Sequence, residues 1–338
     1  MRLSALAFAP ILLSLVSYAS PVPADRTVAD TISPVVLRYR LNPGEMLRYR
    51  LTANVHGSVP ILDSPEPTEL NAVVRIVYIA TPKTKLSDGT SDVDFKVETA
   101  ELEVEKIPFP IPDDQAREIL NQTISMAQTG EVKRVQQGKP LPFGVSIPGV
   151  DPKRLYALLF PIVFQERAVR PGEKWSYKSE LLGGQGASPE FTATLLPAGS
   201  TTKQRIAGGT KASAPGVSPA STRLQEDFQM GVDQKLDKDK KPLKEGDTLR
   251  YTRQGRIEGS GVFNFDRAKG RVQNGTVTIR ANVREDLVGA PDREDQPKQM
   301  VSKVDATVTV QLEPKPDKPL AVQAGGTTTV SAKKETRP

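Results

Sequence analysis

The sequence has no cysteine and a single histidine, and these two features exclude several kinds of site. Without cysteine there is no disulfide, no thiolate nucleophile and no thiolate metal ligand. His56 alone cannot supply the several ligands that a zinc site takes. No nucleophile-elbow pattern surrounds Ser58, so a serine triad with His56 as the base is not indicated. We predict no cofactor, no bound metal and no catalytic residue.

Sites for phosphate and calcium are also poorly supported. The glycines at 183, 184 and 186 join a strand to a loop and precede no helix, so they do not predict a phosphate-binding loop. Calcium needs only oxygen ligands, and two acidic stretches, 88–94 and 233–239, could supply them. Neither has the spacing of an EF-hand loop, and a hairpin turn at Asp88 and Gly89 explains the first stretch better.

Charge of one sign is not concentrated anywhere in the chain. The 46 basic and 40 acidic residues are interleaved, and the formal net charge is +6. A nucleic-acid interface needs a basic stripe or patch. The pattern predicts a mixed, solvated surface and no nucleic-acid partner.

Long apolar runs are scarce, and the run at the N-terminus predicts export. Met1 and Arg2 precede the apolar, uncharged residues 3–18, as in a secretory signal peptide. The run is shorter than the roughly 20 residues of a membrane-spanning helix. We predict cleavage after Ala24, with Ala19 as the alternative, and no membrane span afterwards. Because a lipid anchor needs a cysteine, we expect a free protein in the periplasm or outside the cell.

Alternation of apolar and polar residues at a period of two runs through the chain and predicts strands. The predicted strands are 35–41, 47–55, 70–80, 93–107, 174–181, 191–196, 223–236, 248–257, 261–266, 271–284 and 299–312. Capping residues, prolines and glycines predict two short helices, at 113–128 and 151–160. Asp266 and Gly270 predict a hairpin with a glycine bulge.

These elements predict a mainly β fold. Long antiparallel strands favour a large curled antiparallel sheet or half-barrel with two short helices, and two β-sandwich-like domains are the alternative. The predicted divisions are a signal peptide at 1–24, a β-rich domain at 25–312 and a disordered tail at 313–338. A low-complexity loop at 197–222 could separate two halves of the domain, 25–196 and 223–312.

One short pattern occurs three times: glycine, an acidic residue, any residue, leucine or tryptophan, any residue, tyrosine. Its copies lie at 44–49, 172–177 and 246–251. Glycine makes a turn, the acidic residue stays in solvent, and the last two apolar residues share a sheet face. The pattern could begin a buried strand, or it could line an aromatic groove. In the second interpretation the ligand-binding residues are Tyr49, Trp175, Tyr177 and Tyr251. A diverged duplication about the 197–222 loop also stays open.

Three segments of the chain carry a further signal: LNPGEMLRYRL near the mature start, FQERAVRPGEKWSY in the middle and GVFNFDRAKGRV late in the chain. With these segments the chain resembles a family of exported bacterial proteins of unknown function. The resemblance covers most of the mature chain and rests on signals for turns and strand starts. It implies an exported, β-rich protein, and it transfers no catalytic residue.

The function predicted from these features is a non-catalytic binding module whose ligand is a lipid, an apolar small molecule or an envelope polymer. A carboxylate-dependent envelope hydrolase is one alternative, and it would need two inward carboxyl groups about 5 to 10 Å apart. A structural or assembly scaffold is the other, and a filled interior would favour it.

Overall fold

The structure is a computed structural model, and it describes residues 33–60, 67–136, 157–178, 189–197, 221–238, 243–289 and 298–314. The predicted signal peptide, most of the 197–222 loop and residues 315–338 lie outside the described residues. The chain divides into two units, Met1–Ser33 and Pro34–Pro338. All elements of the sheet belong to the second unit.

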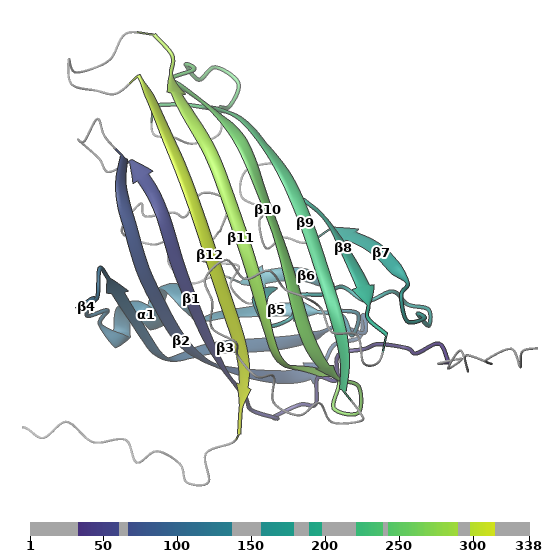
Figure 1. Cartoon of the computed structure of the whole chain (residues 1–338). Coiled ribbons are helices and arrows are strands. Elements are labelled where there is room, and N and C mark those ends of the chain that lie inside the picture. The colour runs from purple at the N-terminus through teal and green to yellow at the C-terminus, as the bar shows by residue number, and fades with distance from the viewer. Residues whose placement is uncertain are drawn as a thin grey trace, which may run out of the picture. The chain divides into compact units, whose positions relative to one another are not determined.

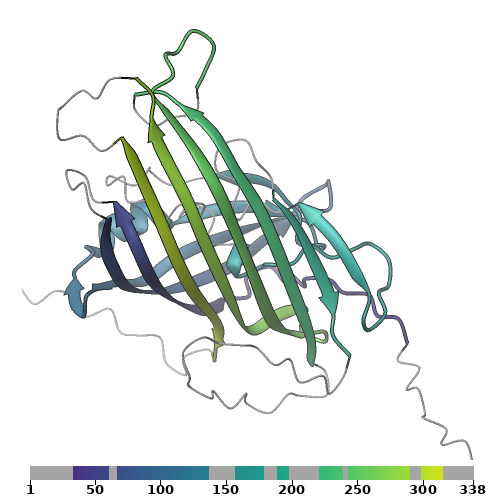
Figure 2. The same cartoon turned by 45° about the horizontal axis from the view of Figure 1, so that its top comes forward.

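Twelve strands form one antiparallel sheet (Figure 1). In chain order they are β1 (Leu47–Pro60), β2 (Pro67–Lys85), β3 (Ser91–Val104), β4 (Ile107–Phe109), β5 (Gln122–Met126), β6 (Val132–Gln136), β7 (Lys174–Lys178), β8 (Glu190–Leu195), β9 (Ser221–Leu236), β10 (Tyr251–Asp266), β11 (Arg271–Leu287) and β12 (Gln299–Glu313). The sheet order is β6-β5-β3-β2-β1-β12-β11-β10-β9-β8-β7, and β4 pairs with β3 off this path. The prediction of a large curled antiparallel sheet is confirmed, as Figure 2 also shows.

Two meanders make up this sheet. In the first, β1, β2, β3, β5 and β6 each pair with the next, and in the second β7 to β12 do the same. Pairing of β1 with β12 joins the two. Strands on both sides of the 197–222 loop therefore belong to one sheet, and β8 pairs directly with β9 across that loop.

The long strand β10 combines two predicted strands, 248–257 and 261–266. The sequence pattern breaks at Gly259 and Gly261, which have no side chain to continue the alternation. Aromatic rings fill the space instead, because a Cβ at Gly259 would lie 2.2 Å from the Phe228 ring. The hairpin after β10 is confirmed: Gly270 has φ +59° and Asp266 Oδ1 accepts the N–H of Lys269 at 2.9 Å.

The helix α1 (Asp113–Leu120) is shorter than the predicted 113–128. Asn121 ends it, and its Oδ1 accepts the backbone N–H of Val97 at 2.7 Å. The chain then continues as β5, whose alternate residues Ile124 and Met126 are buried against the sheet. Over so short a stretch the spacing of apolar residues fits both the helical period of 3.6 and the strand period of two. Pairing with β3 stabilises the strand.

Two further predictions differ from the structure. Residues 35–41 form no strand, and only Val35 makes an isolated antiparallel bridge, to Val169. The predicted strand 93–107 ends at Val104, because the backbone turns back at Glu105 and Lys106 to form β4. Of the second predicted helix, 151–160, only the last four residues are described, and they form a short helical turn followed by a bend.

Candidate functional site

Two adjacent rows of side chains cross one face of the sheet, which we call the inner face. Each row takes one residue from each strand along the sheet, in the order β4, β3, β2, β1, β12, β11, β10, β9, β8 and β7. The first row is Phe109, Leu102, Val74, Ala53, Val308, Val277, Gly261, Glu226, Ala193 and Trp175, and the second is Ile107, Val104, Ala72, Val55, Ala306, Ile279, Gly259, Phe228, Phe191 and Tyr177. Glu226 is the one member of these rows with a carboxyl group.

Burial changes along the rows. From β8 to β11 the larger apolar members, such as Phe191, Phe228 and Val277, are buried. Toward β4 the members become partly exposed, and Ile107 and Phe109 are 61% and 50% exposed. We call Leu102, Val104, Ile107 and Phe109 the β4 corner. The inner face is thus an apolar surface that reaches solvent at this corner.

The turn before β4 holds the corner in place. Glu105 and Lys106 have φ values of +51° and +66°, which are uncommon outside glycine. Asn71 stabilises this turn, because its O accepts the N–H of Glu105, and its N–H and Nδ2 both donate to Glu105 Oε1. A strained turn held by three hydrogen bonds is a feature that sequence patterning did not predict.

The three recurring turns have one shared geometry. Gly44, Gly172 and Gly246 have φ values of +78°, +83° and +88°, which confirms that glycine makes the turn. In each copy the acidic residue donates its N–H to the carbonyl oxygen three residues earlier. Its carboxylate accepts a hydrogen bond from that same residue. The acidic residue therefore closes the turn; Asp247 is exposed as predicted, whereas Glu45 and Glu173 are partly buried and form ion pairs with Arg271 and Arg167.

A segment of the chain itself lies against Trp175 and Tyr177, two of the predicted ligand-binding residues. We call residues 157–166 the strap. The indole N–H of Trp175 donates to the carbonyl oxygen of Val163 at 2.8 Å, and the hydroxyl of Tyr177 donates to the carbonyl oxygen of Pro161 at 3.0 Å. The predicted aromatic pair is therefore brought together, and it binds the strap.

Tyr39, which the sequence pattern did not single out, holds the strap between these two contacts. Its hydroxyl donates to the carbonyl oxygen of Ile162 at 3.2 Å, and its ring contacts those of Phe160, Phe164 and Phe265. Burial raises the pKa of Tyr39 well above its usual value, so the hydroxyl keeps its proton.

The other two predicted ligand-binding residues lie elsewhere on the sheet. Tyr49 is fully buried on β1, and its hydroxyl points to the carbonyl oxygen of Val272 at 3.4 Å. Tyr251 is buried at the start of β10, between Leu236 and Leu287. The four aromatic residues therefore do not form a single groove.

Glu226 is the most unusual ionisable group of the inner face. It is 1% exposed, and its Oε1 makes a short hydrogen bond with the hydroxyl of Tyr177. Its Oε2 is buried and has no hydrogen-bond partner among the described residues. Desolvation is the main cause that raises the pKa of Glu226 to about 8, and the neighbouring charge of Asp227 acts in the same direction. The carboxyl group is therefore neutral at pH 7.

Among the described residues the sheet buries one further carboxyl group, Glu285, which forms an ion pair with Arg253 at 2.8 Å. On β10 the partners of Glu226 and Glu285 are Gly261 and Arg253. Eight residues of strand separate these partners, or about 26 Å at roughly 3.3 Å per residue. Glu226 and Glu285 therefore do not form the close carboxyl pair of a glycoside hydrolase.

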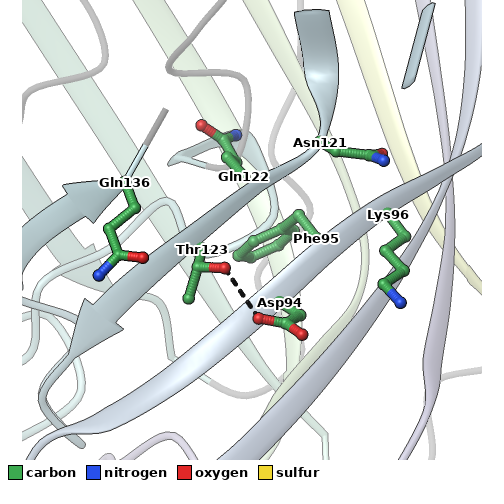
Figure 3. Close-up of a pocket in the computed structure, with 7 residues that line it drawn as sticks. All are labelled: Asp94, Phe95, Lys96, Asn121, Gln122, Thr123 and Gln136. Atoms are coloured by element: carbon green, nitrogen blue, oxygen red, sulfur yellow. Dashed lines mark hydrogen bonds between the residues drawn. The ribbon is translucent and has the colours of Figure 1, made fainter. Parts of the chain in front are cut away.

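A small pocket lies at β3, β5 and β6, at one end of the sheet. Its volume is about 310 Å³, and it is lined by Asp94, Phe95, Lys96, Asn121, Gln122, Thr123 and Gln136 (Figure 3). Thr123 donates to Asp94 Oδ1 at 2.8 Å, and Lys83 lies 2.9 Å from Oδ2. Although partial burial opposes it, these contacts lower the pKa of Asp94, which is therefore ionised at neutral pH.

The remaining candidate residues have ordinary structural positions. Asp88 Oδ1 accepts hydrogen bonds from the N–H and hydroxyl of Thr90, and Gly89 has φ +82°, as expected for a hairpin turn. His56 is exposed on β1, opposite Asn71 and Asp305. In the described part of the chain, no group of three or more histidine, aspartate or glutamate side chains could hold a metal ion. Nor does any described helix have the length and apolar character needed to cross a membrane.

Comparison with known proteins yields no family. No protein-family model matches the chain, and no curated protein matches it. Two solved structures are remotely similar. DynF from the dynemicin biosynthesis pathway of Micromonospora chersina is 8% identical, with coverage of 85% of this chain and 89% of that chain and a TM-score of 0.20. A putative outer membrane lipoprotein-sorting protein domain from Vibrio parahaemolyticus is 10% identical, with coverage of 80% and 87% and a TM-score of 0.13. TM-scores this low support no assignment of fold or function.

Proposed function

We propose that the protein is an exported, non-catalytic binding module that holds a lipid or another apolar small molecule at the β4 corner. One observation carries this proposal: from β11 to β4 every member of the two rows is apolar, and the rows end at Ile107 and Phe109, which are exposed. A contiguous exposed apolar surface on a soluble domain is typical of a binding site. Each apolar side chain covered by a ligand contributes about 25 cal/mol per Å² of area removed from water.

The construction of the corner favours a ligand that contacts side chains over an added strand. Pro108 and Pro110 have no backbone N–H, so the edge at β4 is a poor template for strand pairing. The hydrogen bonds between Asn71 and Glu105 fix the turn before any ligand arrives. A preformed surface loses less conformational entropy on binding, which favours affinity.

The proposal is tested with the fluorescent apolar probe N-phenyl-1-naphthylamine, titrated into the protein lacking residues 1–24. We expect saturable binding by the wild type. The double variant Ile107→Ser/Phe109→Ser should bind about tenfold more weakly, since it removes two apolar contacts of roughly 1 kcal/mol each or less. The matched control is Val36→Ser/Met46→Ser, because these side chains are similarly exposed, at 58% and 54%, and lie outside the rows.

Equal weakening in both double variants would mean that the probe binds exposed apolar surface without preference, and the β4 corner would lose its assignment. Absence of saturable binding by the wild type would have the same consequence. Both variants are surface changes, so their thermal unfolding should match that of the wild type within a few degrees.

A second candidate is an envelope polymer that carries hydroxyl groups, and the pocket at β3, β5 and β6 favours it. Three side-chain amides line that pocket together with the ionised Asp94 and with Lys96. Amides and carboxylates supply the donors and acceptors that hydroxyl groups need. Retention of the protein on insoluble cell-wall polymer, abolished by Thr123→Val/Gln136→Ala and kept by Ile107→Ser/Phe109→Ser, would support this candidate over the first.

A further inference from the structure

The strap is held to the sheet by side chains that donate to its main-chain carbonyl groups. Tyr177, Tyr39 and Trp175 contact the carbonyl oxygens of residues 161, 162 and 163 in succession. The guanidinium group of Arg38 donates to the carbonyl oxygens of residues 165 and 166. Four side chains from two parts of the chain thus hold five carbonyl groups of the strap. Of these contacts, only the one through Tyr177 also involves an acid.

Counting protons at Tyr177 shows what that acid must do. The phenol has one proton and faces two oxygens, the carbonyl oxygen of Pro161 and Glu226 Oε1. The carbonyl oxygen of Pro161 can only accept. If Glu226 is protonated, it donates to Tyr177 and Tyr177 donates to Pro161, and both contacts are hydrogen bonds. If Glu226 is ionised, the two acceptors compete for one proton, and the carboxylate wins because charged acceptors bind more strongly.

Among the described residues, the groups that face Glu226 offer an ionised carboxylate the hydroxyl of Tyr177 but no positive charge. Two ionisable groups face Glu226: Tyr177 on β7, and Tyr39 in the segment before β1. The charge of an ionised Glu226 raises the pKa of both tyrosines. The strap contributes carbonyl oxygens, and the strands on either side contribute Ala193 and Gly261. Asp227, the next residue of β9, opposes ionisation by its negative charge.

We propose that Glu226 is a proton-operated latch: in its protonated form it holds the strap to β7 through Tyr177, and on losing its proton in alkaline solution it releases the strap. Release exposes the carboxylate to water, which removes the cost of a buried unpaired charge. The other hydrogen bonds of the strap, to Tyr39, Trp175, Arg38 and the carbonyl oxygen of Thr129, do not involve an acid. These contacts therefore limit how far the strap moves, and only Glu226 makes the movement depend on pH.

Trp175 is the only tryptophan of the chain, and its indole N–H is bound to the strap, so its fluorescence reports the latch directly. The experiment follows tryptophan emission of the protein lacking residues 1–24 from pH 6 to 9.5. We expect a reversible red shift with a midpoint near pH 8, because burial places the pKa of Glu226 there. Far-UV circular dichroism should stay constant, because the sheet remains folded.

In Glu226→Gln the side-chain amide can donate to Tyr177 at every pH, so the emission should not change over the same range. Asp227→Asn is the matched control, since its carboxylate lies on the face opposite the inner face and bonds Ser260. It should keep the transition and move the midpoint slightly to lower pH, because a charge that opposes ionisation of Glu226 is removed.

Three results would overturn the latch: no transition in the wild type, an equal transition in Glu226→Gln, or loss of the sheet signal together with the red shift. Should Glu226→Gln not fold, hydrogen exchange of the wild type decides between the outcomes. After correction for intrinsic rates, protection in the strap should fall between pH 7 and 9 while protection in β11 stays constant. Parallel loss of protection in both segments would contradict the proposal.

Discussion

The carboxyl group of Glu226 and the hydroxyl group of Tyr177 share a short hydrogen bond inside the sheet. The strands beside Glu226 present only Ala193 and Gly261 to it, which leaves room for the longer side chain of Tyr177 to approach from the next row. Glu226 is buried among apolar residues, so the proton that it keeps affects the stability of the whole domain.

The stability of the protein should therefore depend on pH in the window between the two pKa values of Glu226. This group titrates near 4.5 when exposed, and burial raises its pKa to about 8 in the folded protein. Between these values the folded state binds a proton that the unfolded state has lost. The free energy of unfolding should fall as pH rises through this window, by up to about 1.4 kcal/mol per pH unit, and level off above it.

Urea unfolding of the wild type and of Glu226→Gln, measured from pH 5 to pH 9, checks this prediction. The variant has no proton to lose at this position, so its unfolding free energy should change less over the window. Identical slopes for the two proteins would show that another group controls the pH dependence.

Two buried tyrosines should respond in opposite ways to loss of the hydroxyl group. Tyr78 is 1% exposed, and its hydroxyl has no hydrogen-bond partner among the described residues. Tyr78→Phe should raise the unfolding free energy by about 1 kcal/mol, since an unsatisfied buried hydroxyl is removed. Tyr39→Phe should lower it by about 1 kcal/mol, because the bond to Ile162 is lost. Denaturant unfolding measures both, and an equal loss in the two variants would contradict the difference in pairing.

The strained turn at the β4 corner offers a stabilising substitution. Lys106 has φ +66°, where a Cβ costs roughly 1 kcal/mol that glycine avoids. Lys106→Gly should therefore raise the thermal unfolding midpoint by a few degrees. Lys106→Ala keeps the Cβ and removes the charge, so it should not. Equal stabilisation by both variants would assign the effect to charge, and strain at this turn would be ruled out.

Much of the sheet was predictable from the sequence, because alternation of side chains is a local property. The predicted strands that became β9, β11 and β12 match their observed positions closely, since each has one buried and one wet face. Errors occurred where the local pattern has two solutions. Residues 122–126 fit the end of a helix or a strand, and Gly259 interrupts the apolar pattern of a strand that continues through it.

The candidate site was predictable only in part. The sequence correctly predicts that Trp175 and Tyr177 are neighbours on one face, because they are two residues apart on one strand. Their contacts with the strap and with Glu226 join positions 12, 16 and 49 residues apart in the chain. No local pattern encodes such contacts. The exposed pair Ile107 and Phe109 was missed because it lies beyond a turn whose backbone is unusual for glutamate and lysine.

The sequence by itself determined that this protein is mainly β, that it lacks cysteine chemistry, and that glycine turns begin three of its strands, because composition, period and turn residues act locally. The tertiary structure decided which aromatic residues meet, that Trp175 and Tyr177 hold the protein's own strap, and that one carboxyl group is buried among apolar rows. Those outcomes depend on the register of strands distant in the chain, and register is set by packing across the whole sheet.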